Sequence, residues 1–486
     1  MRTRWCTASR EELIAELERQ QREIERLREE TDRADRAERD RDALRRDLER
    51  VRRRNERLRK ELDLARRAGK RQAAPFSKNR PSPAPGRPGR KPGAAYGRRA
   101  RRPLPTTIDE QYDAPLPASC PACAGTVIET DVETQYHEDL PPVRPIVRAF
   151  RIHIGTCATC GRRVQGRHAL QTSDALGAAA AQLGPQAVAT AAHLHKEGGL
   201  PLGKIARFYQ QQFGLTVTPG GLVQALHRAA RQAAPTYTAL VDTVRQSPVV
   251  TPDETGWRVG AELHWLWVAA TPSTTVYAIQ SGRGFAEAAA LLGADFAGTL
   301  ARDGWAPYRQ FEQAAHQSCV QHLLRRARDL QTDHPRAPLP YQVQDVFQQA
   351  LTLRDRHVAG EVSDHGLAVA RGHLETRLSV ILEQPSTVPA VRRFAAHLDR
   401  EWPALFSFLH DPTIPATNWR AEQAIRPAVV NRKVCGGNRT SKGAETQQIL
   451  MSVFRTSRQR ALDPLRVLAD LLRERVPRIA AALFPT

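Results

Sequence analysis

The 486-residue sequence lacks several features that would place it in common protein classes. No uninterrupted apolar run reaches the roughly 18 residues that a membrane-spanning helix needs, which excludes an integral membrane protein. The first residues, MRTRWCTASREEL, contain no apolar signal-peptide core, so we expect a cytosolic chain. Cysteine occurs only seven times, too rarely for a disulfide framework in a chain of this length.

Acidic residues are outnumbered by basic ones and are absent from one segment. The chain has 73 Lys and Arg against 52 Asp and Glu, which is a net charge of +21. Residues 66–105 carry 13 basic groups and no acidic one, together with eight Pro and five Gly. This composition predicts a disordered basic linker and favours a polyanionic partner. The side chains expected to contact phosphates there are Arg87, Arg90, Lys91, Arg98, Arg99, Arg101 and Arg102.

Glycine and proline are also absent from residues 11–65, which predicts one long helix. Apolar residues occupy its heptad core positions in two sets that differ in phase by three residues. Such a shift overwinds a coiled coil without ending it. We therefore expect a homo-oligomer formed through this helix; the alternative is a solvated single helix held by Arg–Glu pairs. The two sets are Leu13, Leu17, Ile24 and Leu27, and Leu44, Leu48, Val51, Leu58 and Leu62.

Four of the seven cysteines form two CxxC pairs, Cys120 with Cys123 and Cys157 with Cys160. This spacing predicts a structural Zn²⁺ site with four thiolate ligands, and the alternative is four ordinary buried thiols. The segments ETDVETQYHEDL and VRAFRIHIGTC between the pairs alternate apolar and polar residues, which predicts a ribbon of strands. A small zinc-binding domain is expected here.

The next region is predicted to be helical and to contain a helix-turn-helix. Gly214 is expected to end the first helix of this motif and Thr218 to cap the second. The second helix would present Gln224, His227 and Arg228 outward, where they could read DNA. Helix pairs of this kind are also common in plain bundles, so this reading stays open.

From residue 247 the pattern changes to five short apolar stretches that are typical of strands. The first and fourth stretches each finish on an aspartate beside a turn, Asp253 in TPDETGWR and Asp303 in ARDGWAPY. Open α/β sheets place their chemistry where strands end, so two neighbouring carboxylates of this kind can share metal ions. Either aspartate taken alone is more typical of a turn or a helix cap.

A third acidic candidate lies far downstream in NWRAEQAIRP. Asn418 is expected to cap a helix that contains Glu422, and Pro427 is expected to kink or end it. On spacing alone, Glu422 is an ordinary helix glutamate with Arg426 as its i,i+4 partner.

Several neighbours of these carboxylates have two readings. Glu254 should point away from Asp253 on an extended chain and serve at best as an auxiliary group. Trp257 and Trp305 are most simply core and rim aromatics, although either could stack a splayed base. Cys319 and His322, in the sequence CVQH, are structural or contribute to a metal or phosphate site.

In this order the motifs resemble the IS66 family of bacterial insertion-sequence transposases over essentially the whole chain. The matching motifs are the coiled coil with basic linker, the CxxC…CxxC finger, DETGWR, DGWAPY, CVQHLLRR, NWRAEQAIRP and GGNRTSKGAE. The resemblance implies a ribonuclease-H-like α/β core, as in retroviral integrases, with a catalytic triad of Asp253, Asp303 and Glu422. The chain departs from the family pattern at Trp419, where a second asparagine is more frequent, and at Gln423, where a basic residue is frequent.

The resemblance also implies a DDE-type DNA transposase. Such an enzyme binds the terminal inverted repeats of its element, hydrolyses phosphodiester bonds at the ends and joins the 3′-hydroxyl ends to target DNA. Mg²⁺ or Mn²⁺ at the three carboxylates would supply two-metal catalysis, and Zn²⁺ would be structural. The basic residues that follow Glu422 are expected to form a phosphate-binding rim, and the alternative is an ordinary solvated charged face; they are Arg426, Arg432, Lys433, Arg439 and Lys442. Small accessory proteins of the element are possible partners, and a nucleoid-associated cytoplasmic location is expected. The alternatives are a catalytically silent DNA-binding or regulatory protein and an oligomeric scaffold.

The expected domains follow this order along the chain. Asp303 and Glu422 lie 119 positions apart, so the helical stretch between them is interpreted as an insertion that clamps DNA, shields the site or merely packs. The expected ranges are a coiled coil at 11–65, a basic linker at 66–105, a zinc-binding domain at 106–170, a helical DNA-binding region at 180–240, a catalytic core at 247–330 and 416–460, a helical insertion at 331–415 and a C-terminal helix at 461–486.

Overall fold

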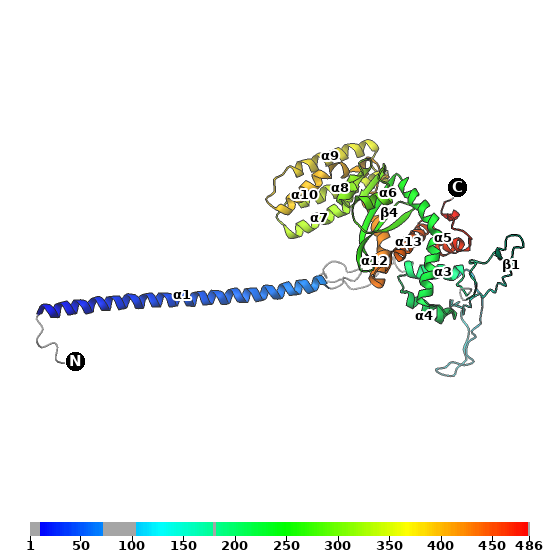
Figure 1. Cartoon of the computed structure of the whole chain (residues 1–486), viewed down its shortest axis with the longest axis horizontal. Helices are drawn as coiled ribbons and strands as arrows, with labels where there is room; N and C mark the ends of the chain where they lie inside the picture. The colour runs from blue at the N-terminus through cyan, green and yellow to red at the C-terminus, as the bar shows by residue number, and fades with distance from the viewer. Residues whose placement is uncertain (1–9, 71–103, 178–180, 485–486) are drawn as a thin grey trace. The chain divides into compact units, whose positions relative to one another are not determined.

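The computed structural model describes residues 10–70, 104–177 and 181–484, and the chain divides into two units, residues 1–89 and 90–486. The first unit contains one continuous helix, α1 (Arg10–Lys70), shown in blue in Figure 1. The helix passes without a break through residues 31–37, where the heptad phase shifts. Leu17, Leu44 and Val51 are more than half exposed on this helix, and ion pairs such as Arg33 with Glu29 lie along it. The apolar seam is therefore open to a partner, and the coiled-coil oligomer stays a prediction.

The predicted basic linker falls mostly on residues 71–103, outside the part of the chain that the structure describes. The same is true of its expected phosphate contacts, Arg87, Arg90, Lys91, Arg98, Arg99, Arg101 and Arg102.

Residues 104–177 carry the four paired cysteines. Strands β1 (Ile154–Thr156) and β2 (Arg163–Gln165) pair antiparallel on either side of the second CxxC loop. The ribbon predicted between the two cysteine pairs is shorter than expected: the segment VRAFRIHIGTC contains β1, whereas residues 126–153 contain neither helix nor strand. Their apolar side chains, among them Ile128, Val132 and Val147, are largely exposed, so no packed face supports a sheet there.

Three helices follow: α3 (Pro185–Lys196), α4 (Leu202–Phe213) and α5 (Pro219–Arg245). Gly214 ends α4 with a φ of 65°, and the Thr218 side chain accepts a hydrogen bond from the Gly221 N–H at the start of α5, as predicted. The second helix of the predicted motif is much longer than a recognition helix requires. Its buried residues, including Leu226 and Ala230, pack against helix α13 (Ser441–Gln459).

A five-stranded mixed sheet forms the centre of the second unit, and its strand order is β5-β4-β3-β6-β7. Strand β4 is antiparallel to β3 and β5, whereas β6 runs parallel to both β3 and β7. Five strands in this region were predicted from the sequence. Their bounds are β3 (Val249–Val259), β4 (Glu262–Ala270), β5 (Thr275–Gln280), β6 (Thr299–Arg302) and β7 (Ala315–Ser318), with α6 (Phe285–Leu292) and the 3₁₀ helix η2 (Ala306–Gln310) between strands.

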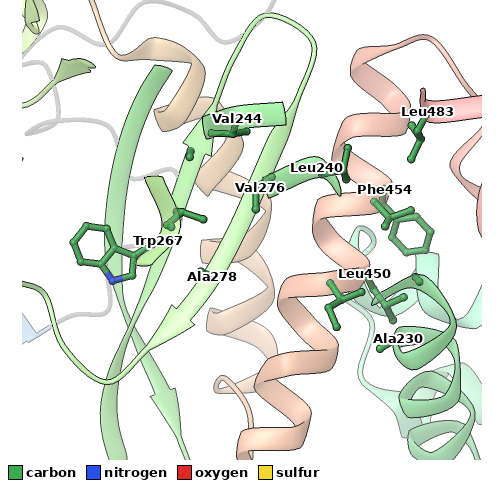
Figure 2. Close-up of a cluster of buried hydrophobic side chains, with 14 of the residues drawn as sticks. Ala230, Leu240, Val244, Trp267, Val276, Ala278, Leu450, Phe454 and Leu483 are labelled. Atoms are coloured by element: carbon green, nitrogen blue, oxygen red, sulfur yellow. The ribbon is translucent and has the colours of Figure 1, made fainter. Parts of the chain in front are cut away.

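Helices cover both faces of this sheet, which gives a mixed α/β fold. Alternate residues of β4 point to opposite faces, and Trp267 belongs to a large buried cluster that also contains residues of α5, α13 and helix α14 (Pro464–Arg473). Figure 2 labels Leu450 and Phe454 of α13 from this cluster and shows Trp267 on the other side of the strands in this view. Leu266 and Val268 instead pack on helix α12 (Trp419–Cys435). The sheet therefore holds β3 rigidly between two packed layers.

A second group of helices has its own apolar core, which includes Val343, Phe347, Leu378 and Phe394. These helices lie together in Figure 1. No helix of the described residues is long and apolar enough to cross a membrane. The group consists of α7 (Val320–Asp333), α8 (Leu339–Val358), α9 (Asp364–Leu382), α10 (Pro389–Arg400), η3 (Trp402–Ala404) and α11 (Ser407–His410).

Candidate active site

Asp253 lies in the middle of β3 and not at a strand end, which corrects the sequence-based prediction. β3 pairs with β6 only at Val249 and Val250, and beyond that point it continues against β4, where Asp253 lies opposite Val268. β3 therefore extends beyond its pairing with the parallel strand β6, and Asp253 lies just past the end of that pairing. Its Oδ1 accepts a hydrogen bond from the Glu254 N–H at 2.9 Å.

Asp303 directly follows β6, as predicted, so it stands at the same edge of the sheet. Its Oδ1 accepts a hydrogen bond of 2.9 Å from the Trp305 N–H. The turn passes through Gly304, whose φ of 88° favours glycine. The hydrogen bond and the turn fix the direction of the Asp303 carboxylate.

Glu422 belongs to the first turn of α12, the helix that covers the Asp253 face of the sheet. Its Oε1 lies 3.7 Å from His322 Nε2, and no ion pair joins it to Arg426, which was its expected partner. Cys319, at the start of α7, accepts a hydrogen bond through Sγ from the Asn418 N–H at 3.4 Å. Cys319 therefore ties the start of α7 to the start of α12, and this contact supports its structural reading.

The three predicted carboxylates influence one another electrostatically. Burial, then the charges of Glu254, Asp303 and Glu422, raise the pKa of Asp253 to about 8. Within the described ranges, no three His, Cys, Asp or Glu side chains converge closely enough to hold one metal ion. The site therefore carries several negative charges, but its side chains do not lie close enough together to surround one metal ion.

Asn418 does not cap α12 with its side chain, which corrects that prediction. The side chain is fully buried, and neither its Oδ1 nor its Nδ2 has a hydrogen-bond partner among the described residues. His322 Nδ1 is likewise buried without a partner. Orphaned polar atoms of this kind are uncommon in folded proteins and tend to occur at functional sites.

Pro427 was expected to kink or end α12; the helix continues through it to Cys435, so the prediction of a short helix that ends there is wrong. Ala424 and Ala428, on either side of the proline, are buried against the sheet, and this packing outweighs the missing backbone hydrogen bond.

Gln423, Arg426 and Lys433 are exposed, whereas the Arg432 guanidinium donates to the Gly256 carbonyl and to Thr255 Oγ1. The Arg432 side chain is thus used to brace β3.

An arginine that the sequence analysis missed stands beside the carboxylates. The Arg283 guanidinium lies 4.6 Å from the ring centre of Trp265 and 4.0 Å from that of Trp305, and it pairs with Glu254 at 2.8 Å. The Tyr308 hydroxyl donates to the second oxygen of Glu254 at 2.6 Å. Only the three-dimensional fold brings these residues together, since Arg283 lies in the loop before α6.

Glu254 and Trp257, on the same strand as Asp253, both have contacts inside the protein. Glu254 lies opposite Trp267 in the register with β4, on the other face of the strand from Asp253, as predicted. Trp257 is almost fully buried, and its Nε1 donates to Asn438 Oδ1 at 2.8 Å. Trp257 is therefore a core residue and does not stack a base, whereas Trp305 is partly exposed.

A buried ionic network lies next to Asp303. Arg302, the residue before it, forms an ion pair with Glu401, which follows α10. Glu401 also pairs with Arg309 at 2.9 Å and accepts a hydrogen bond from the Ser318 hydroxyl at 2.6 Å. Burial opposes the charge of Glu401, but Arg302 and these hydrogen bonds outweigh it and hold its pKa below the usual value. The network joins the second group of helices to the edge of the sheet.

Each CxxC loop is folded as a tight turn. The Cys120 N–H donates to the Gly125 carbonyl and the Cys157 N–H to the Arg162 carbonyl, both at 2.9 Å. Backbone N–H groups of the loops lower the pKa of both Cys120 and Cys157, which favours the thiolate that Zn²⁺ binds. The structure does not gather three of these four sulfurs at one point, so the four-thiolate site stays a prediction.

Comparison with known families gives a match over residues 180–446 to the family described as Transposase IS66 family. The matched range contains Asp253, Asp303 and Glu422. No curated protein matches the chain.

Proposed function

Because the chain belongs to the IS66 family of transposases, we propose that it cuts and joins DNA at a site formed by Asp253, Asp303 and Glu422. The observation that carries this proposal is the placement of the three carboxylates: Asp253 on the central strand, Asp303 directly after the neighbouring parallel strand, and Glu422 on the helix that covers the Asp253 face. In agreement with this placement, the charges of Asp303 and Glu422 contribute to the raised pKa of Asp253. The strand order supports a ribonuclease-H-like core, in which an antiparallel three-stranded unit is extended by two parallel strands.

The donor set fits a pair of divalent cations, which transposases of this kind generally use. Asp253, Asp303 and Glu422 would hold Mg²⁺ or Mn²⁺, since carboxylate oxygens are the ligands that hard metal ions prefer. His322 lies beside Glu422 through Nε2, whereas its Nδ1 and the amide atoms of Asn418 are buried without a hydrogen-bond partner among the described residues. When bound, the two ions activate an attacking oxygen and stabilise the leaving oxygen.

The chain itself orients the reacting groups. The Trp305 N–H holds the Asp303 carboxylate in place, and the stacked Arg283 keeps the Glu254 charge balanced close to the site. The exposed Arg426 and Lys433 of α12 would contact DNA phosphates. We propose that the substrates are the terminal inverted repeats of the element and a target duplex, which the freed 3′-hydroxyl ends attack.

The test is a cleavage and strand-transfer assay with DNA that carries the terminal inverted repeats. An active transposase nicks at the element ends and joins them to target DNA only when Mg²⁺ or Mn²⁺ is present. A catalytically silent DNA-binding protein would shift the DNA without nicking it, and a scaffold would do neither. Absence of metal-dependent nicking would therefore overturn the proposed reaction.

The basic linker is proposed to supply nonspecific DNA affinity. Deleting residues 70–102 should flatten the dependence of the binding constant on salt concentration, because each lost phosphate contact lowers the log–log slope by about 0.9. Fluorescence anisotropy with a labelled duplex measures this slope. An unchanged slope would show that the linker does not contact DNA.

The proposed protein partners are further copies of this chain, bound through the coiled coil, and accessory proteins of the element.

The CxxC pairs are proposed to bind one structural Zn²⁺. The purified chain should then contain about one equivalent of zinc per subunit. The variant Cys157→Ser should lose most of this zinc, whereas Cys435→Ser, which lies outside the pairs, should keep it. Elemental analysis of the two variants measures the difference, and equal zinc contents would contradict the assignment.

A further inference from the structure

A groove lies between the first half of α5 and the start of α13, with a volume of about 540 Å³. We call it the α5–α13 groove; none of the three proposed catalytic carboxylates lines it. Its polar lining consists of His227, Arg231, Ser441, Lys442, Glu445 and Thr446.

The groove has an excess of positive charge. Arg231 and Lys442 are exposed, and no ion pair or hydrogen bond joins either side chain to another residue of the described chain. Glu445 is the one acidic residue among those that line it. Lys196, whose Nζ donates to Gln447 of α13, lies nearby, but burial lowers its pKa to about 7, so it is only partly charged at neutral pH. After burial, the charges of Lys442, Lys196 and Arg231 are what lowers the pKa of His227.

The shape and chemistry of the lining suit a phosphodiester backbone. Arginine offers paired N–H donors and lysine a point charge, which are the groups that proteins most often use for phosphate. The Ser441 hydroxyl and the positive end of the α13 dipole lie at the same place. Arg231, Ser441 and Lys442 are exposed, so phosphate groups can approach these side chains from solvent.

The lining also changes how the predicted helix-turn-helix is understood. His227, which was expected to read bases, is bonded through Nδ1 to Thr446 Oγ1 at 2.7 Å and is only partly exposed. Gln224, Arg228 and Arg231 follow one another along the exposed face of α5, at the spacing of a helix stripe. This stripe leads into the groove, so α5 and α13 together present one basic surface.

We propose that the α5–α13 groove binds backbone phosphates of double-stranded DNA through Arg231 and Lys442, without reading the base sequence. The proposal rests on the proposed function, since the DNA is that on which the transposase acts. Phosphate contacts weaken binding to all sequences alike when they are removed, whereas base contacts change specificity.

The test uses the full-length protein, without divalent metal, and labelled duplexes with and without the terminal repeat. Arg231→Ala/Lys442→Ala should lower the log–log salt slope by about 2 on both duplexes, one for each lost phosphate contact. Glu445→Gln should tighten binding to both, an effect of opposite sign that misfolding cannot produce. The charge-matched control, Arg336→Ala/Arg400→Ala, replaces two exposed arginines of the second helix group and should keep the slope.

Each other outcome overturns the proposal. An unchanged slope in the Arg231/Lys442 variant removes the groove from the DNA interface, and an equal fall in the control shows that the loss is not specific to the groove. A loss confined to the terminal-repeat duplex shows base reading instead. Because binding is measured without metal, a chain that binds through the groove but never nicks DNA contradicts the proposed reaction and leaves this inference standing.

Discussion

Asp253→Asn should abolish Mg²⁺-dependent nicking and strand transfer, with a loss of about a thousandfold or more. The substitution keeps the size of the side chain and the oxygen that accepts the Glu254 N–H, but it removes the carboxylate that would ionise on binding a metal ion. Metal ions contribute several kcal/mol to stabilising the transition state, and each 1.36 kcal/mol is a tenfold change in rate. Single-turnover cleavage of terminal-repeat DNA measures the loss.

The same variant should fold at least as stably as the parent protein when no metal is present. The pKa of Asp253 is raised from 3.8 to about 8, so its ionisation destabilises the folded state as the pH rises through this range. Asparagine removes that cost, and the melting temperature at pH 8 should not fall. Asp329→Asn, at an exposed position of α7, is the matched control and should retain activity. Nicking that survives in Asp253→Asn would sink the assignment of the site.

Local sequence signals were sufficient where neighbouring residues determine the structure. Gly214 and Thr218 end and begin helices through their own backbone and hydroxyl chemistry, and both were predicted. Asp303 was placed correctly because its strand stops at a turn. The five strands were likewise visible in their apolar patterns.

The predictions failed where distant parts of the chain decide the outcome. The residues near Asp253 do not indicate that β3 continues against β4 after its pairing with β6 has ended. The length of β3 depends on its partner strands, which lie elsewhere in the sequence. Pro427 is accommodated because the flanking alanines are buried against the sheet. Arg283 reaches Glu254 from another loop, a contact between residues 29 positions apart. Tertiary packing overrode local propensity in each case.

Glu401 connects the second helix group to the sheet in a way that no local pattern reveals, since it pairs with Arg302 across 99 positions. The side chain of Glu401 is fully buried and that of Arg302 is 2% exposed, so the pair lies in an environment of low polarity. Water cannot replace a partner that is removed from such a pair. The network is therefore expected to matter for stability more than any exposed ion pair of the chain.

Glu401→Ala should lower the free energy of unfolding by about 3 to 5 kcal/mol, because it leaves the Arg302 charge buried without a partner. Urea denaturation measures the change. Glu383→Ala, at the exposed end of α9, is the control and should change stability by less than about 0.5 kcal/mol. Because the pKa of Glu401 is lowered in the folded protein, the pair's contribution is present at neutral pH and is lost as the pH falls through that lowered value.

A second variant separates the ion pair from the volume that Glu401 fills. Arg302→Met/Glu401→Leu removes both charges and keeps apolar bulk, so it should recover much of the stability that Glu401→Ala loses. A double-mutant cycle then gives the coupling energy of the pair. If the double variant is as unstable as Glu401→Ala although it keeps the apolar bulk, the ion pair and its hydrogen bonds, and not the filled volume, hold the helices to the sheet. Recovery of stability without recovery of nicking would show that Arg302, next to Asp303, also fixes the position of the catalytic carboxylate.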